Sequence, residues 1–411
     1  MLLTQKLNII VKNLGPAFFI IGYVVGTGSV TSMVVSGANF GLSLSWALFL
    51  SCFFTFFLIA AISKLTIVSG ETLLYNFKKH FGKPVTLFII LALIISIVSS
   101  CIGIMGVVAE VVVEWIRVNT NIDFLNQIYI SLLFIALLIT LFWLGKHQYF
   151  LNIMAFLVGF MALSFIITSI IVLKESEFPL KAYFPELPEA GNTGLVIAGM
   201  VGTTMAGICL ISRSILVQEQ NWKIADLKTE RKDAIYSMVM TFLISLAIMI
   251  SATGTLYFQD IKVDSPIDLM HALGPWAGEF ALTLFTLGIL GAGLSSIFPN
   301  LLLTPWIISD YKKEDRNMKK PLYKLLVVIV ALTCLIVPIM GGKPVWILIA
   351  SQAFSPFIMP LITLFLLILI NKKSVMGDYR AKLGLNIALI ATLIFNLFMM
   401  VIAIESLIAI I

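Results

Sequence analysis

Two short polar strings decide how this chain folds: VGTGS at residues 25–29 and VGTTMAG at residues 201–207. Each lies near the middle of an apolar stretch long enough to cross a bilayer, roughly 14–36 and 193–218. Backbone groups inside hydrocarbon must be hydrogen-bonded internally, so non-helical backbone at that depth survives only where it is buried in protein or lines a cavity. The two strings therefore predict two broken helices that meet at a ligand site.

The sequence around these strings is that of an integral membrane protein. Of its 411 residues, 60% are hydrophobic and 12% are charged, whereas soluble domains typically carry about 25% charged residues. An ordinary soluble enzyme is excluded. Hydropathy predicts an all-α protein with eleven crossings, at roughly 14–36, 42–63, 85–113, 127–144, 149–173, 193–218, 233–257, 275–309, 322–340, 344–370 and 384–410.

The basic residues predict the orientation of these crossings. Of the 27 Lys and Arg residues, 21 fall in loops on the side of the N-terminus, five fall on the other side, and Arg213 lies within a crossing. Cytoplasmic loops carry the excess of Lys and Arg. We therefore expect a cytoplasmic N-terminus and an external C-terminus, and the composition suggests a bacterial inner (plasma) membrane.

The two predicted breaks stand five crossings apart. Because five is odd, the second set of crossings begins on the opposite side of the membrane from the first, which is the pattern of inverted-repeat transporters. We expect one transmembrane domain over residues 1–411, with repeats at 14–173 and 193–370 and an extra helix at 384–410. The alternative is that Gly, Ser and Thr only allow close helix packing.

The residues around the breaks resemble the Nramp family of divalent-metal transporters. The resemblance runs from Gly15-Pro16 through the first polar string to Gly37-Ala38-Asn39-Phe40-Gly41 and Trp46, and a second match is Ser214-Ile215-Leu216-Val217-Gln218. Weaker matches follow in the family's order, at 109–111, 291–296 and 351–352. The resemblance implies a LeuT-type fold with eleven helices, discontinuous helices 1 and 6, and ion-coupled alternating access.

The same resemblance shows that the family's metal ligands are missing. By spacing, the family's metal-binding Asp, Pro and Asn fall on Gly26, Thr27 and Ser29, and its Met-Pro-His falls on Ala206-Gly207-Ile208. A slip of one residue would instead let Met205 serve as the methionine. The resemblance further implies that Glu110 and Lys324 fall near residues used for proton movement, and that Gln352 lines the site from the tenth crossing.

The groups that remain at the predicted site are all neutral. They are the hydroxyls of Thr27, Ser29, Thr203 and Thr204, the carbonyls of Gly26 and Gly202, and the thioether of Met205. Carbonyls and hydroxyls suit a monovalent ion or the polar end of a small organic solute. A dehydrated divalent cation recovers its hydration energy chiefly from anionic ligands. We therefore expect poor handling of Mn²⁺ and Fe²⁺, and we name no metal ligand.

Arg213 and two glutamates are the other candidates for coupling or gating. By the resemblance, Arg213 stands where the family has a histidine. An arginine at this depth faces a cavity, pairs with a carboxylate such as Glu110, Glu114 or Glu219, or extends its head to the inner interface. Glu110 and Glu114 share one face of the third crossing. They can pass protons or bind Na⁺, or Glu114 lies at the outer interface beside Arg117.

Three functions remain open from the sequence. The first is an Nramp-like secondary transporter, moving or coupled to a cation, with a remodelled site. The second is a transporter of a monovalent ion or small polar organic solute on the same fold, and the third is a non-transporting receptor. No nucleotide, zinc-enzyme or Cys/His ligand motif is present, so we expect no enzyme and no cofactor. The expected partners are an ion or small-molecule substrate and lipid, with no nucleic acid; the oligomeric state is open.

Overall fold

A computed structural model of the chain describes residues 24–120, 124–144, 147–175, 192–263, 265–314 and 318–408. Within these ranges the chain forms helices joined by short loops and turns, and no strand is found there. The helices are α3 Thr27–Phe40, α4 Ser45–Ser69, α5 Leu73–Phe81, α6 Lys83–Thr120, α7 Gln127–Leu144, α8 His147–Glu175, α9 Thr193–Thr204, α10 Gly207–Glu219, α11 Leu227–Thr255, α12 Gly274–Ala277, α13 Ala281–Lys312, α14 Pro321–Thr333, α15 Ile336–Met340, α16 Pro344–Gln352, α17 Ser355–Asn371, α18 Lys373–Met376 and α19 Leu383–Ile408.

Ten of the eleven predicted membrane crossings have a helical counterpart in the described residues. Ten helices or interrupted helix pairs there are long and apolar enough to span a bilayer. The first predicted crossing, 14–36, lies partly outside the described residues, and α3 contains its second half. The all-α prediction is therefore confirmed.

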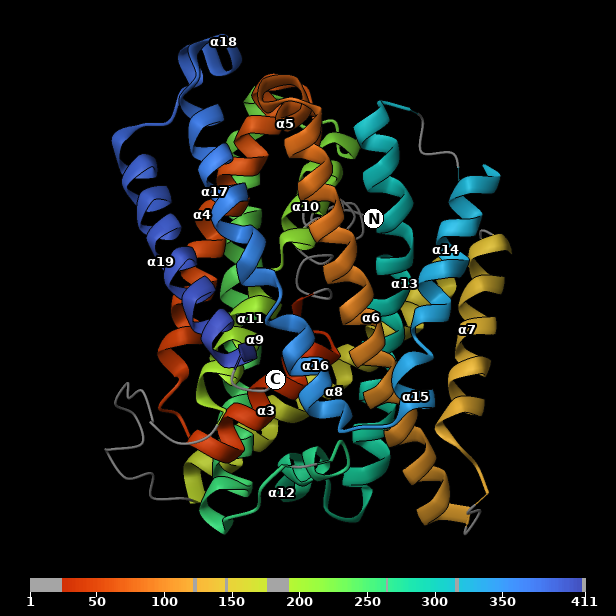
Figure 1. Cartoon of the computed structure of the whole chain (residues 1–411). Coiled ribbons are helices and arrows are strands. Elements are labelled where there is room, and N and C mark those ends of the chain that lie inside the picture. The colour runs from red at the N-terminus through yellow and green to blue at the C-terminus, as the bar shows by residue number, and fades with distance from the viewer. Residues whose placement is uncertain are drawn as a thin grey trace, which may run out of the picture.

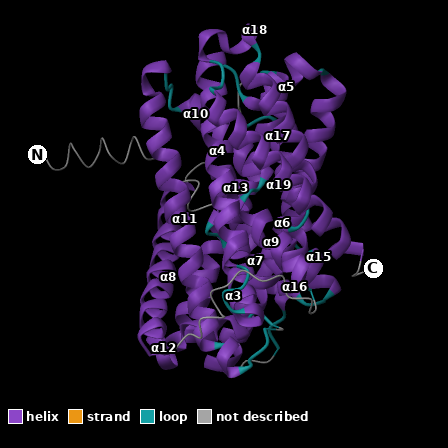
Figure 2. Cartoon of the chain, turned by 90° about the vertical axis from the view of Figure 1, so that its left-hand side faces the viewer, coloured by secondary structure: helices purple, strands orange, loops and turns teal. Residues whose placement is uncertain are grey.

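The helices stand side by side in one elongated bundle (Figure 1, Figure 2). Helix α11 packs along α3, α4 and α8, while α13 packs along α6 and α8. Both views place α5 and α18 at one end of the bundle and α12 at the other. Because α5 and α18 carry basic residues such as Lys79 and Lys373, their end corresponds to the face that the sequence predicts to be cytoplasmic.

Local chemistry explains several helix ends near the site. Helix α4 ends at Ser69 and is capped by Gly70, whose φ of 70° is left-handed and whose N–H donates to Thr66 O. Helix α5 then begins after Thr72, whose hydroxyl accepts a hydrogen bond from Tyr75 N at 3.4 Å. The tenth crossing is interrupted between Gln352 and Ser355, next to Pro356, where the sequence favours local unwinding.

Candidate functional site

The sixth crossing is broken where its polar string predicts. Helix α9 ends at Thr204 and α10 begins at Gly207, so Met205 and Ala206 are not helical. Ala206 has extended backbone, with φ −63° and ψ 122°. The chain continues in a new helix after only two residues, which frees backbone groups at mid-membrane.

The first crossing shows the matching feature on its described side. Helix α3 begins at Thr27, and Gly26 before it is extended, with φ −90° and ψ −174°. The Gly26 carbonyl accepts from Val30 N at 3.0 Å, which starts the new helix. Residues 1–23, including the earlier part of this crossing, lie outside the described residues. Helix 6 is therefore discontinuous, as the resemblance implies, and α3 begins at the break that the sequence predicts for helix 1.

A small cavity of about 30 Å³ lies between the two breaks. Five of the predicted site residues line it: Gly26, Ser29, Thr203, Ala206 and Gln352. The rest of its wall comes from the loop before α3 and from α3, α6, α10, α13 and α17, through Val24, Gly28, Ser96, Ile97, Ser100, Ile104, Ile208, Ser296, Asn300 and Ser355. None of these lining residues carries a charged side chain.

Hydrogen bonds hold the polar wall of this cavity in place. Gln352 Nε2 donates to Ser100 Oγ at 3.3 Å, linking α16 to α6. The hydroxyls of Ser29 and Ser245 lie 3.4 Å apart and link α3 to α11. Thr203 Oγ1 donates to the Met200 carbonyl at 3.1 Å within its own helix. The acceptors that these residues offer to a ligand are amide and hydroxyl oxygens, all of them neutral.

Glycine lets two helices approach α16 closely at this point. A Cβ on Gly202 would collide with the Gln352 carbonyl oxygen, and a Cβ on Gly28 would lie 2.7 Å from Gln352 Nε2. Gly202 therefore shapes the site by letting α9 pack against α16, rather than by lining the cavity.

Three further predicted ligands are buried beside the cavity without lining it. Thr204 Oγ1 donates to the Met200 carbonyl at 3.2 Å, and Met205 is buried. Ala206 lines the cavity, whereas Met205 does not. Thr27 Oγ1 is buried and has no hydrogen-bond partner among the described residues.

Five residues with polar side chains that line the cavity were not identified from the sequence: Ser96, Ser100, Ser296, Asn300 and Ser355. Ser96 and Ser100 are four residues apart on α6, and Ser296 and Asn300 are four apart on α13. Polar residues with this spacing share one helix face. The spacing is therefore the sequence signal that could have predicted the parts of the cavity wall on α6 and α13.

Of the alternatives predicted for Arg213, the structure supports pairing with carboxylates rather than extension to the interface. Its side chain on α10 is fully buried and forms ion pairs with Asp233 at 2.5 Å and Glu230 at 3.3 Å, both on α11. Its Nε also donates to Ser63 Oγ at 2.9 Å. The sequence suggested Glu110, Glu114 or Glu219 as partners, whereas the structure gives Glu230 and Asp233.

The other two predicted coupling residues lie away from the cavity. Glu110 follows Ser100 by ten residues, which is about 15 Å along α6, and it accepts from Gln127 Nε2 at 3.4 Å. Glu114 pairs with Arg117 at 2.7 Å, in agreement with the interface alternative. Lys324 is exposed on the first turns of α14. Their roles in coupling stay predictions.

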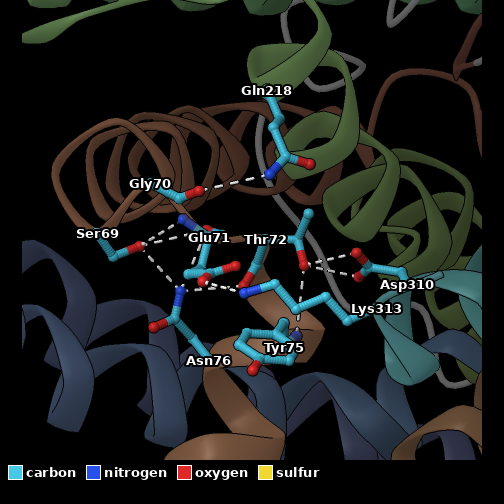
Figure 3. Close-up of polar contacts among 9 residues, drawn as sticks. All are labelled: Ser69, Gly70, Glu71, Thr72, Tyr75, Asn76, Gln218, Asp310 and Lys313. Carbon is cyan, nitrogen blue, oxygen red and sulfur yellow. Dashed lines mark hydrogen bonds and ion pairs between the residues drawn. The ribbon is translucent and has the colours of Figure 1, made fainter. Parts of the chain in front are cut away.

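A second, charged cavity of about 540 Å³ opens at the end of the bundle that carries α5. Figure 3 shows its main contacts: Thr72 Oγ1 donates to the Asp310 carboxylate, and Lys313 Nζ donates to Glu71 Oε1 at 2.8 Å. This hydrogen bond to Glu71 raises the pKa of Lys313 above its ordinary value. Gln218, from the Ser214–Gln218 match, donates to the Gly70 carbonyl at 3.4 Å.

Neither cavity offers a ready-made metal centre. Across the part of the chain that the structure describes, no three His, Cys, Asp or Glu side chains are grouped so that they could hold a metal ion. The central cavity therefore offers coordination by neutral oxygens only.

Comparison with known proteins identifies what the chain resembles. The family model of natural resistance-associated macrophage protein-like proteins (Nramp) matches residues 17–408. The divalent metal cation transporter MntH of Clostridium acetobutylicum is 25% identical over 386 residues, covering 91% of this chain and 86% of the relative. The Nramp protein 2 homologue of Dictyostelium discoideum is 23% identical over 389 residues, 91% of this chain and 60% of that protein.

Solved structures share the fold. A variant of the manganese transporter of Eremococcus coleocola superposes with a TM-score of 0.75 at 14% identity, over 97% of this chain and 87% of that one. MhsT in complex with L-phenylalanine superposes with a TM-score of 0.63 at 15% identity, over 96% of this chain and 98% of that one. The fold is therefore of the LeuT type.

Proposed function

This chain belongs to the Nramp family of membrane transporters, and from this premise we propose that it is a secondary transporter whose central site binds a cation through neutral oxygen ligands. The observation that carries the proposal is the cavity between the two helix breaks. Residues with hydroxyl and amide side chains line it, and no lining residue is charged.

The chemistry of this wall argues against Mn²⁺ and Fe²⁺ as good substrates. These ions prefer carboxylate, carbonyl and imidazole ligands, and removing a divalent charge from water is costly without an anionic partner. Gly26 stands where the resemblance places the family's aspartate, and its neighbours Ser29 and Thr203 add only hydroxyls. Uptake of Mn²⁺ should therefore be weak, although its relatives are called divalent metal cation transporters.

The size of the cavity favours a monovalent cation among the alternatives. Pockets for small organic molecules typically measure about 300–1,000 Å³, whereas this one measures about 30 Å³. A bare Na⁺ or K⁺ fits that volume and is coordinated well by hydroxyl and carbonyl oxygens. The second candidate function was transport of a monovalent ion or of a small polar organic solute. Of these two substrates, the size of the cavity favours the monovalent cation.

In this proposal the chain works as one transport unit of two inverted repeats, 14–173 and 193–370, with helix 384–410 added. It sits in a bacterial inner membrane with its N-terminus in the cytoplasm. Gly26, Ser29, Thr203, Ala206 and Gln352 contact the substrate, while Thr27, Gly202, Thr204 and Met205 position the broken helices. Glu110, Arg213 and Lys324 are the proposed coupling residues.

Ion flux into proteoliposomes tests the proposal. We expect saturable uptake of Na⁺ or K⁺ and little uptake of Mn²⁺, Fe²⁺ or amino acids. Ser100→Ala, which removes a cavity oxygen, should reduce the uptake, whereas the matched variant Ser374→Ala on exposed α18 should leave it unchanged. Saturable, high-affinity Mn²⁺ uptake by the unaltered protein would refute the neutral-site proposal.

A further inference from the structure

Among the described residues, the cluster formed by Arg213, Asp233 and Glu230 places two carboxyl groups against one cation. Arg213 contributes one positive charge, and Asp233 and Glu230 contribute two carboxyl groups. All three side chains are at most 3% exposed. An unbalanced charge in such a place costs several kcal/mol of solvation. The cluster becomes neutral when one of the two carboxyl groups holds a proton.

The geometry distinguishes the two carboxyl groups. Asp233 Oδ2 lies 2.5 Å from Arg213 Nη1, which makes Asp233 the closer counterion. Glu230 Oε1 lies 3.3 Å from Nη2, a longer contact. Glu230 is also three residues from the start of α11 at Leu227, close to the end of the bundle where basic residues gather. Glu230 is thus the group with the looser ion pair and the shorter route to water.

We propose that Glu230 is a proton-binding site of this transporter, taking a proton from cytoplasmic water and releasing it there while the Arg213–Asp233 pair stays intact. On uptake the Glu230 carboxylate becomes a carboxylic acid, and on release it becomes a carboxylate again. No bond other than the O–H bond forms or breaks.

The surroundings of Glu230 leave few other groups to compete for this proton. The charged groups that face it are Arg213 from α10 and Asp233 from α11. Helix α4 contributes the Ser63 hydroxyl, which lies within hydrogen-bond distance of the cluster. The Cys209 thiol lies one turn before Arg213 on α10, and the Trp222 ring lies 5.5 Å from the guanidinium.

The location gives the proton a route to influence transport. Helix α10 begins at Gly207, directly after the break that lines the central cavity, and Arg213 fastens it to α4 and α11. Loss of the proton restores the second ion pair on Arg213 and tightens this attachment. The coupling role rests on the proposed transport function, whereas the protonation of Glu230 does not.

Infrared difference spectroscopy of the whole protein in lipid vesicles, recorded across a pH series, tests the protonation directly. We expect a protonated carboxylic acid C=O band that shifts when glutamate is labelled with ¹³C at its side-chain carboxyl, and that is lost in Glu230→Gln. Glu405→Gln, which changes an exposed glutamate on α19, should keep the band. A band that ignores the label, or no such band at any pH, overturns the proposal without any variant having to fold.

Flux measurements test the coupling. Cation uptake by the unaltered protein should change with cytoplasmic pH, and Glu230→Gln should remove that dependence. Uptake that is insensitive to pH while the infrared band is present would overturn the coupling role. Absence of any cation uptake counts against the proposed function instead, and the infrared result still decides whether Glu230 binds a proton.

Discussion

The central cavity and the Arg213 cluster are two polar regions in one apolar bundle, and they differ in charge. The cavity presents neutral oxygens from Ser29, Thr203 and Gln352, whereas the cluster buries three ionisable groups. Arg213 follows the start of α10 by six residues, about 9 Å along the helix. The comparison shows that α10 keeps the ligand-binding end of the helix apart from its fixed charge. A cation bound in the cavity is therefore not in direct contact with the buried Arg213.

Removing a counterion from the cluster gives the largest expected effect. Asp233→Asn leaves Arg213 with the looser Glu230 partner, and breaking a buried ion pair costs about 3–5 kcal/mol. We expect a large drop in the midpoint of unfolding in detergent, measured by heat or denaturant. The exposed change Asp378→Asn serves as control. Equal unfolding midpoints for both variants would show that the cluster does not stabilise the fold. The proposed difference between a stabilising charged cluster and a ligand-binding cavity would then be wrong.

The close approach of α9 to α16 gives the next largest effect. Gly202→Ala places a Cβ against the Gln352 carbonyl, and overpacking of this kind costs about 1–3 kcal/mol. Gly159→Ala on α8 is the matched control, because nothing lies within 4 Å of its new Cβ and Ala favours a helix over Gly. We expect the unfolding midpoint to fall for the first variant only. A Gly202→Ala protein of normal stability and flux would mean that the wall of the cavity is not tightly packed.

Adding one charge to the cavity sharpens the comparison further. Gly26 has an extended backbone that any residue can adopt, so Gly26→Asp introduces a carboxylate without backbone strain. We expect Mn²⁺ affinity, measured by calorimetry, to rise at least about tenfold, which is about 1.4 kcal/mol. Gly26→Asn provides the neutral control. Similar Mn²⁺ affinity in both variants would show that charge is not what the site lacks.

The charged cavity at the α5 end gives the smallest effects. Thr72→Ala removes the hydroxyl that caps α5 and bonds Asp310, at a cost of about 1 kcal/mol. Lys313→Gln should change stability less, because the Lys313 side chain that pairs with Glu71 is exposed to solvent. Unfolding midpoints of the two variants check this order, and the reverse order would show that the surface ion pair contributes more than the buried hydroxyl.

The sequence predicted the parts of this molecule that depend on local pattern. Apolar runs gave the crossings. The strings at 25–29 and 201–207 gave the breaks, because a run of glycine and hydroxyl residues at mid-membrane favours local unwinding beside a cavity over a continuous helix. Five of the nine predicted substrate-binding residues line the cavity.

The features that the sequence did not predict depend on tertiary structure. Ser100 and Asn300 each have a polar partner four residues earlier, Ser96 and Ser296. Serine and asparagine also serve as ordinary packing residues in apolar helices, so this spacing alone did not show that the two faces line a cavity. Glu230 lies between Lys228 and Arg231 and was assigned to a cytoplasmic loop, since the seventh crossing was predicted to begin at 233. Helix α11 begins six residues earlier, at Leu227, and this extra length buries both acids.

Helix α6 has a consequence for the bilayer itself. Its 38 residues, Lys83–Thr120, extend about 57 Å at 1.5 Å per residue, nearly twice the roughly 30 Å of hydrocarbon in a typical membrane. The helix must therefore lie oblique to the membrane normal or project beyond the headgroups. Ser96 and Ser100 lie on this helix, so the acyl-chain length of the lipid should affect how deep their hydroxyls lie in the membrane. Thin and thick membranes should therefore hold α6, and with it the wall of the cavity, at different tilt angles.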